Sequence, residues 1–150
     1  MSALIIQPVG IVPYPQRHNF WRVIQAGIFD WIHEENDTRT RLTVDVGFGS
    51  DLTSTPWGVW NILPPCDTDY VQPAIAHDFL YCTHLFPKEY ADAFFWELMV
   101  ACETPTWKRE LLYQSVLRYG HSSYESGPER QKFNSNYMLT TTGGACDERD

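Results

Sequence analysis

Residues 73–96 read PAIAHDFLYCTHLFPKEYADAFFW, a mostly apolar stretch with two prolines that predicts two short helices. Proline suits the first turn of a helix, so the first helix begins near residue 73 and ends near residue 82. The second helix spans residues 88–102 for the same reason. Only a few residues separate the two, and we therefore expect an antiparallel helix pair.

Polar side chains interrupt these helices at spacings that bring them together. His77 and Tyr81 are four residues apart and share one helix face. If the helices pack antiparallel about a turn near Leu85, Asp92 lies opposite His77 and Lys88 lies opposite Tyr81. A buried Asp92 needs donors, because an unpaired buried carboxylate costs several kcal/mol. The sequence predicts one polar cluster between the helices.

The cluster has two interpretations that the residues alone leave open. A histidine held by a carboxylate keeps one tautomer, and its other nitrogen can accept a proton, which is the core of a general-base dyad. His77, Asp92 and Tyr81 are then the candidate catalytic residues. The same pair can also serve only to join two helices.

A metal site is a further alternative at this cluster. Zinc at His77, Asp78 and His84 lacks a closed ligand set. Calcium prefers oxygen ligands, which Asp78 with Asp51 or with carbonyl groups of residues 47–56 would supply. Calcium is therefore the cofactor that the sequence allows.

Residues 47–72 are rich in Gly, Pro, Thr and Trp and show no helical period, which predicts a long ordered loop. Its first part permits unusual backbone angles and turns closed by side chains. The residues expected to give the loop these backbone angles and turns are Gly47, Gly49, Thr53, Ser54 and Pro56. They form either a self-satisfied structural turn or a loop that faces His77 and presents oxygen atoms to an ion or substrate.

The remaining chain completes an α+β domain over residues 20–120. Residues 20–24, 27–33 and 41–47 alternate apolar and polar positions and predict a three-stranded antiparallel meander. A polar connection joins the last two strands at residues 34–37. The N-terminal meander is thus followed by helices.

A third helix follows Thr104 and Pro105 and is expected to end at Gly120. Five of its residues are predicted to form a core-facing stripe: Trp107, Leu111, Leu112, Val116 and Tyr119. Residues 1–19 carry three prolines and predict an extended N-terminal arm, and residues 121–150 predict an extended polar C-terminal arm.

Composition narrows the classes of function. The 150 residues are 43% hydrophobic and 15% aromatic, which favours a core of large rings or surface buried against partners. A net charge of -8 argues against binding nucleic acid. No stretch approaches the roughly 18 apolar residues of a membrane span, and four scattered cysteines predict free thiols.

Several motifs now combine into a resemblance. Asp51-x-Thr53-Ser54-x-Pro56, His77-Asp78-x-Leu80-Tyr81, Ala91-Asp92 and Arg118-Tyr119-Gly120 occur in this order. The pattern resembles an uncharacterised protein family common in bacteriophages and prophages, over about residues 20–120. The family usually has Arg where Lys88 stands here.

This resemblance to the phage family implies that the chain is a virion component of a phage tail, baseplate or neck. It would be made in the host bacterial cytoplasm and contact other virion proteins through residues 1–19 and 121–150.

The helix pair is also similar to the active site of secreted phospholipase A2. This resemblance implies that His77 is a general base, that Asp78 binds calcium, and that Asp92 and Tyr81 orient the histidine. The alternative function is therefore a calcium-dependent hydrolase of lipid or cell-envelope substrates, used in phage entry or lysis. The cysteines that flank the phospholipase histidine are replaced here by alanines.

Overall fold

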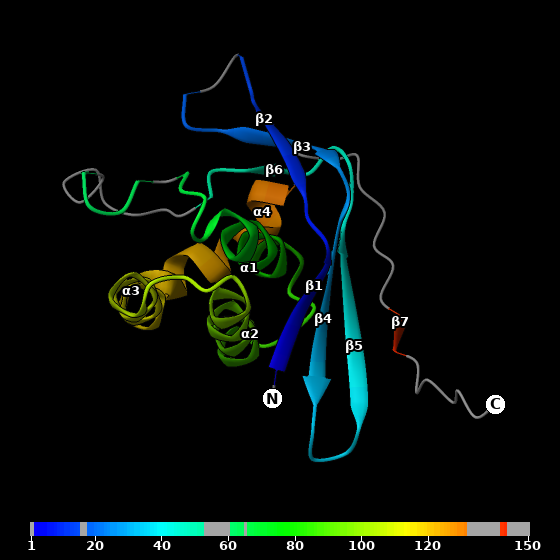
Figure 1. Cartoon of the computed structure of the whole chain (residues 1–150). Helices are drawn as coiled ribbons and strands as arrows, with labels where there is room; N and C mark the ends of the chain where they lie inside the picture. Colours follow the sequence, from blue (N-terminus) through cyan, green and yellow to red (C-terminus); the bar gives the residue numbers. More distant parts are fainter. Residues whose placement is uncertain (1, 16–17, 53–60, 65, 132–141, 144–150) are drawn as a thin grey trace.

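A computed structural model of the chain shows two small antiparallel sheets with helices packed on one side of them (Figure 1). The structure describes residues 2–15, 18–52, 61–64, 66–131 and 142–143. Most strands come first along the chain and the helices follow. The predicted α+β class is therefore confirmed.

The larger sheet has the strand order β1-β4-β5-β7, and all its neighbours are antiparallel. These strands are Ser2–Gln7, Gly27–His33, Thr38–Val44 and Thr142–Gly143. Successive residues of a strand point to opposite faces, and Phe29 and Trp31 of β4 point to the helical side, where both are buried. The predicted connection at residues 34–37 is confirmed as the link between β4 and β5, which pair along their whole length.

The smaller sheet has the order β2-β3-β6. Its strands are Gly10–Pro13, Trp21–Gln25 and Gly49–Ser50. The prediction of a single three-stranded meander is wrong in this detail, because β3 pairs with β2 and β6 while β4 pairs with β1 and β5. The period-two pattern of residues 20–47 shows which segments are strands, but their partners include segments outside that range.

The predicted N-terminal arm of residues 1–19 contains β1 and β2 in its described part, and these strands belong to both sheets. Its backbone groups pair with β4 through β1 and with β3 through β2. Ala3 is buried and Ile5 packs against the core. The segment is therefore held by ladder hydrogen bonds and by apolar contacts.

Within the described residues, four helices follow β1 to β6. They are α1 (Val71–Thr83), α2 (Lys88–Ala101), α3 (Thr106–Glu125) and α4 (Gly127–Gln131). Pro73 lies in the first turn of α1, and His84 ends that helix in a left-handed conformation with φ of 52°. Pro87 and Pro105 are the N-cap residues of α2 and α3. None of the described helices is long and apolar enough to cross a membrane.

The third helix differs from its prediction in two ways. It does not end at Gly120, which is buried inside it, but continues to Glu125. The predicted core-facing stripe is wrong for three members, since Trp107, Leu111 and Tyr119 are exposed. Leu112 is buried and Val116 packs beside it, because α3 contacts the other helices along a narrow line.

The predicted C-terminal arm of residues 121–150 begins as helix. Its first residues complete α3 and form α4, and β7 adds a short strand to the edge of β5. Residues 132–141 and 144–150 lie outside the described residues, so the arm stays a prediction there.

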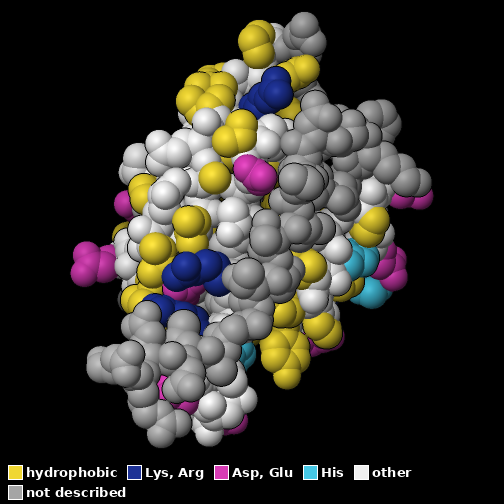
Figure 2. Space-filling view, turned by 90° about the vertical axis from the view of Figure 1, so that its right-hand side faces the viewer, with side chains coloured by type: hydrophobic (Ala, Val, Ile, Leu, Met, Phe, Trp, Pro, Cys, Tyr) yellow, Lys and Arg dark blue, Asp and Glu magenta, His cyan; other side chains and the backbone are white. Residues whose placement is uncertain are grey.

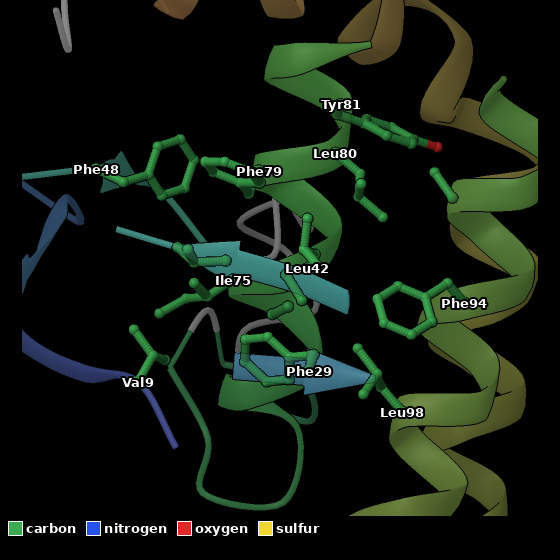
Figure 3. Packing of buried hydrophobic residues seen from close by; sticks show 14 of the residues in the cluster. Val9, Phe29, Leu42, Phe48, Ile75, Phe79, Leu80, Tyr81, Phe94 and Leu98 are labelled. Atoms are coloured by element: carbon green, nitrogen blue, oxygen red, sulfur yellow. The ribbon is translucent and has the colours of Figure 1, made fainter. Parts of the chain in front are cut away.

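The main core lies between the sheets and the first two helices. Phe29 and Leu42 from the sheet meet Ile75 of α1 and Phe94 of α2, while Tyr81 points away from the sheet (Figure 3). A smaller cluster joins α2 and α3 to the segment before α1. Its buried members are Leu63, Tyr70, Phe95, Met99 and Leu112. Helix α2 therefore contributes apolar side chains to both clusters, Phe94 and Leu98 to the main core and Phe95 and Met99 to the smaller one.

The sheet face away from the helices mixes apolar and charged groups. Seen from the side of β5 and β7, hydrophobic side chains lie beside basic ones (Figure 2). Asp30 is fully buried, and Arg41 forms a bidentate pair with it at 2.8 and 2.9 Å. Arg39 lies 2.9 Å from the same carboxylate. Leu4 and Ile6 of β1 stay exposed.

Candidate functional site

The predicted pairing across the helix hairpin is present. His77 Nε2 lies 2.9 Å from Asp92 Oδ1, and the Tyr81 hydroxyl donates to the same oxygen at 2.6 Å. Lys88 Nζ donates to Asp92 Oδ2 at 2.6 Å. Both carboxylate oxygens of Asp92 are therefore bound by side chains of α1 and α2.

This network reaches a third helix through Lys88. Its Nζ also donates to the backbone carbonyl of Val116 in α3, at 2.9 Å. The ammonium group lies 5.9 Å from the centre of the Tyr81 ring, which agrees with the predicted position of Lys88 opposite Tyr81. One carboxylate thus connects α1, α2 and α3, and we call its four side chains the Asp92 network: His77, Tyr81, Lys88 and Asp92.

The network is almost closed to solvent. Asp92 is 1% exposed and His77 is 8% exposed. The His77 ring stacks on Phe95 of α2, with ring centres 4.5 Å apart, and also contacts Tyr81. The Tyr81 ring meets Tyr124 near the end of α3, edge to face. Aromatic rings therefore enclose the polar groups.

Burial and hydrogen bonding act in opposite directions on the titration of this cluster. Burial alone raises the pKa of Asp92, but hydrogen bonds from His77, Lys88 and Tyr81 hold it below its usual range. Burial and the hydrogen bond to Asp92 raise the pKa of the Tyr81 hydroxyl. Asp92 is therefore an anion at neutral pH and Tyr81 stays a neutral donor.

The ionised carboxylate determines what His77 can do chemically. A carboxylate accepts hydrogen bonds only, so His77 Nε2 carries the proton that faces Asp92. Neutral His77 then has Nδ1 as its unprotonated ring nitrogen, the state that a general base requires. The Lys88 charge balances Asp92, which lowers the energy of the buried ion.

Gly120 is a part of the site that sequence analysis did not explain. A Cβ atom at this position would lie 2.6 Å from the Tyr81 hydroxyl oxygen and 3.2 Å from Lys88 Cε. Only glycine lets α3 approach the Asp92 network this closely. The Arg118-Tyr119-Gly120 motif was noted from the sequence, but its contact with Tyr81 depends on tertiary packing. The stack of Phe95 on His77 was missed for the same reason.

The proposed metal ligands lie apart from these hydrogen bonds. Asp78 is buried, about 100° round α1 from His77. Within the described part of the chain, no group of three or more His, Cys, Asp or Glu is placed to hold a metal ion. His84 instead stacks on Tyr124 and bonds to its carbonyl oxygen. The assignment of calcium to Asp78 and Asp51 stays a prediction.

The loop before α1 is described only at its start. Gly47 has φ of 96°, which favours glycine, and its N–H donates to Val23. Gly49 belongs to β6, and the Ser50 hydroxyl accepts from the Leu52 N–H at 2.9 Å, which makes a turn closed by a side chain. Thr53, Ser54 and Pro56 lie outside the described residues.

Comparison with known proteins gives one match. A family model described as "Protein of unknown function (DUF1353)" matches residues 21–116, which include the Asp92 network and exclude Gly120. No curated protein and no solved structure matches the chain. The expected membership of an uncharacterised family is therefore confirmed.

Proposed function

This chain belongs to the DUF1353 family of proteins of unknown function, and on that premise we propose that it is a structural protein of the bacteriophage virion. It is made in the host bacterial cytoplasm and incorporated in the tail, baseplate or neck. The observation that carries the proposal is the exposed apolar surface of the N-terminal strands.

Large aliphatic side chains face outward along these strands. Leu4 and Ile6 of β1 are 41% and 47% exposed, and Val12 of β2 and Ile24 of β3 are also exposed. β1 lies at one edge of its sheet, and an edge strand presents backbone groups to a second chain. Apolar side chains on such an edge favour burial against a neighbouring virion protein.

In this proposal the Asp92 network is a structural connection between helices. A buried carboxylate with donors from two helices resists changes in helix packing, because separating α1 from α2 removes the hydrogen bonds of His77 and Tyr81 to Asp92. A virion subunit benefits from a rigid helical layer behind its assembly surface. Residues 121–150 add a second contact region with other virion proteins.

Incorporation into particles tests this function. We expect mass spectrometry to find the chain in purified particles of the phage that encodes it. A double variant, Leu4→Glu with Ile6→Glu, should be lost from the particles while it folds normally in isolation. Leu117→Glu is the matched control, since Leu117 is similarly exposed on α3. Absence of the wild-type chain from particles, or normal incorporation of the double variant, contradicts the proposal.

A second candidate, a calcium-dependent hydrolase of lipid or cell-envelope substrates, is favoured by one specific observation. His77 Nε2 and the Tyr81 hydroxyl both meet the same oxygen of Asp92. This is the orientation of a general-base histidine that the phospholipase A2 resemblance implies. In that case Asp78, with Asp51, holds the calcium ion.

Ester hydrolysis separates the two candidates. The hydrolase predicts that phospholipid vesicles are cleaved with calcium and not with a chelator, and that Asp78→Asn loses this activity at unchanged stability. The structural protein predicts the same background rate for wild type and for Asp78→Asn under both conditions.

A further inference from the structure

Helix α2 carries a second polar surface away from the Asp92 network. A helix turns about 100° per residue, so Glu89, Tyr90 and Ala93 face a different side from Lys88 and Asp92. These three residues line a cavity of about 520 Å³ between α2 and the β4–β5 hairpin. Its other lining residues are Trp31, His33, Glu35, Asn36 and Thr38. No prediction assigned a role to this cavity.

The cavity is acidic. Glu35 and Glu89 contribute two carboxylates from opposite walls, and the described lining contains no Lys or Arg. Neither carboxylate forms an ion pair with a described residue. Two basic residues directly adjoin the lining in the sequence: Lys88 is engaged by Asp92 and the Val116 carbonyl, and Arg39 pairs with Asp30. The charge of the lining therefore favours a cation.

Aromatic rings form the other part of the wall. Tyr90 is 52% exposed and its ring centre is 6.0 Å from that of Trp31, while the His33 ring centre lies 4.8 Å from that of Trp31 with the two planes tilted by 37°. Trp31 is 1% exposed and also stacks on Phe94, so it fixes the position of the other rings. Tyr90 and His33 thus present ring surface beside the two carboxylates.

One buried donor in this wall is unsatisfied. Trp31 Nε1 is buried and has no acceptor among the described residues. An unpaired buried donor costs about 1–3 kcal/mol, so its presence in a cavity wall is informative. A guanidinium group has no acceptor, so this donor would be satisfied by a carbonyl oxygen on the molecule that carries the guanidinium, such as the backbone carbonyl of a partner's arginine.

From the two carboxylates and the aromatic rings, we propose that this cavity binds a guanidinium group, carried either by a small free molecule or by an arginine side chain of a partner. A guanidinium is planar and stacks on aromatic rings, while its edge pairs with carboxylates, which suits it to a cavity lined by Tyr90, Glu35 and Glu89 better than a compact ammonium group. The chain uses the same chemistry elsewhere. Arg41 pairs bidentately with Asp30, and Arg109 Cζ lies 5.0 Å from the Trp96 ring centre.

Calorimetry with matched probes tests the proposal. N-acetyl-arginine amide should bind, whereas N-acetyl-citrulline amide, of nearly the same shape but neutral, should bind at least about tenfold more weakly. Methylguanidinium, which lacks the peptide groups, distinguishes a free small molecule from an arginine side chain of a partner. Equal affinity for methylguanidinium indicates a free small molecule, and tighter binding of the capped arginine, with a shifted Trp31 indole N–H resonance, indicates a partner's side chain.

Variants locate the binding. Glu35→Gln with Glu89→Gln should weaken capped arginine about tenfold or more, while Glu110→Gln with Glu129→Gln makes the same charge change elsewhere and should leave affinity unchanged. Tyr90→Leu should also weaken binding and provides a second test at a single exposed position. The proposal is overturned if neither guanidinium probe binds, if citrulline amide binds equally well, or if the control pair loses as much affinity.

Discussion

Two carboxylates on different sides of α2 have opposite surroundings. The Asp92 carboxylate is buried and receives hydrogen bonds from three side chains. The Glu89 carboxylate is exposed beside a cavity and pairs with no described basic residue. Both residues lie in the first turns of one helix. The difference comes from their neighbours, since α1 and α3 close over Asp92 while Glu89 faces the β4–β5 hairpin across a cavity.

This contrast separates two uses of charge. A carboxylate whose partners come from the chain itself contributes to stability and depends on exact packing. A carboxylate without partners contributes little to folding and remains available to a ligand. The predictions below test whether the two faces of α2 behave in these two ways.

The largest effect is expected from removing the central carboxylate. Asp92→Ala leaves Lys88 buried without its counterion and should lower the free energy of unfolding by about 3–5 kcal/mol. Denaturant unfolding followed by circular dichroism measures this. Glu89→Ala on the same helix is the matched control and should unfold close to wild type. Equal losses from the two substitutions contradict the comparison.

Removal of one donor should have a smaller effect. Tyr81→Phe keeps the ring and deletes the hydroxyl that donates to Asp92, so we expect a loss of about 1.5–3 kcal/mol in the free energy of unfolding. The control is Tyr90→Phe, because Tyr90 lines the open cavity and is 52% exposed. A stability for Tyr81→Phe that equals wild type means that the hydrogen bond contributes nothing.

Gly120 tests how closely α3 approaches the network. Alanine is normally favoured in a helix, but here its Cβ would overlap the Tyr81 hydroxyl, and we expect Gly120→Ala to destabilise by about 1–3 kcal/mol. Gln114→Ala, an exposed change in the same helix, should be neutral. In the Tyr81→Phe background the cost of Gly120→Ala should shrink, because the overlapping oxygen is gone. Strict additivity of the two changes argues against this contact.

The smallest effect is a dependence on pH. The pKa of Asp92 is lowered in the folded protein, so its contribution is complete above the unfolded value of about 4 and is lost as pH falls toward the folded pKa. The stability difference between wild type and Asp92→Asn should therefore be constant near neutral pH and decrease below about pH 4. Unfolding curves measured across this range check the prediction, and a difference that grows on acidification has the wrong sign.

The two faces of α2 also differ in how far the sequence predicts them. His77 and Asp92 were placed together because both lie within one short hairpin, where helix geometry relates sequence spacing to position. Glu35 and Glu89 belong to distant segments, and no local pattern joins them. The role of Gly120 is equally hard to predict from the sequence, since its contact with Tyr81 forms only when α3 packs against α1.

The sheets illustrate the same limit. Alternating apolar residues locate β3 and β4, because each strand has its own two faces, whereas the strand predicted at residues 41–47 is β5 at Thr38–Val44. Their partners in β1 and β2 come from a segment whose prolines suggested an arm. The helical pattern of α3 predicts that Trp107 and Tyr119 are buried, but both are exposed. An apolar residue on a helix is buried only where another element covers it, and the sequence of the helix does not show where that is.

The central claim, that the Asp92 network is structural, is tested most directly by measuring stability and ester hydrolysis together for wild type and His77→Ala. We predict that the variant loses about 2–4 kcal/mol in the free energy of unfolding, through the lost hydrogen bond and the lost stack on Phe95. Hydrolysis of phospholipid vesicles should then be equal for both proteins, with calcium and with a chelator. A calcium-dependent activity of the wild type that disappears in a fully stable His77→Ala would contradict the claim and establish His77 as the base of an enzyme.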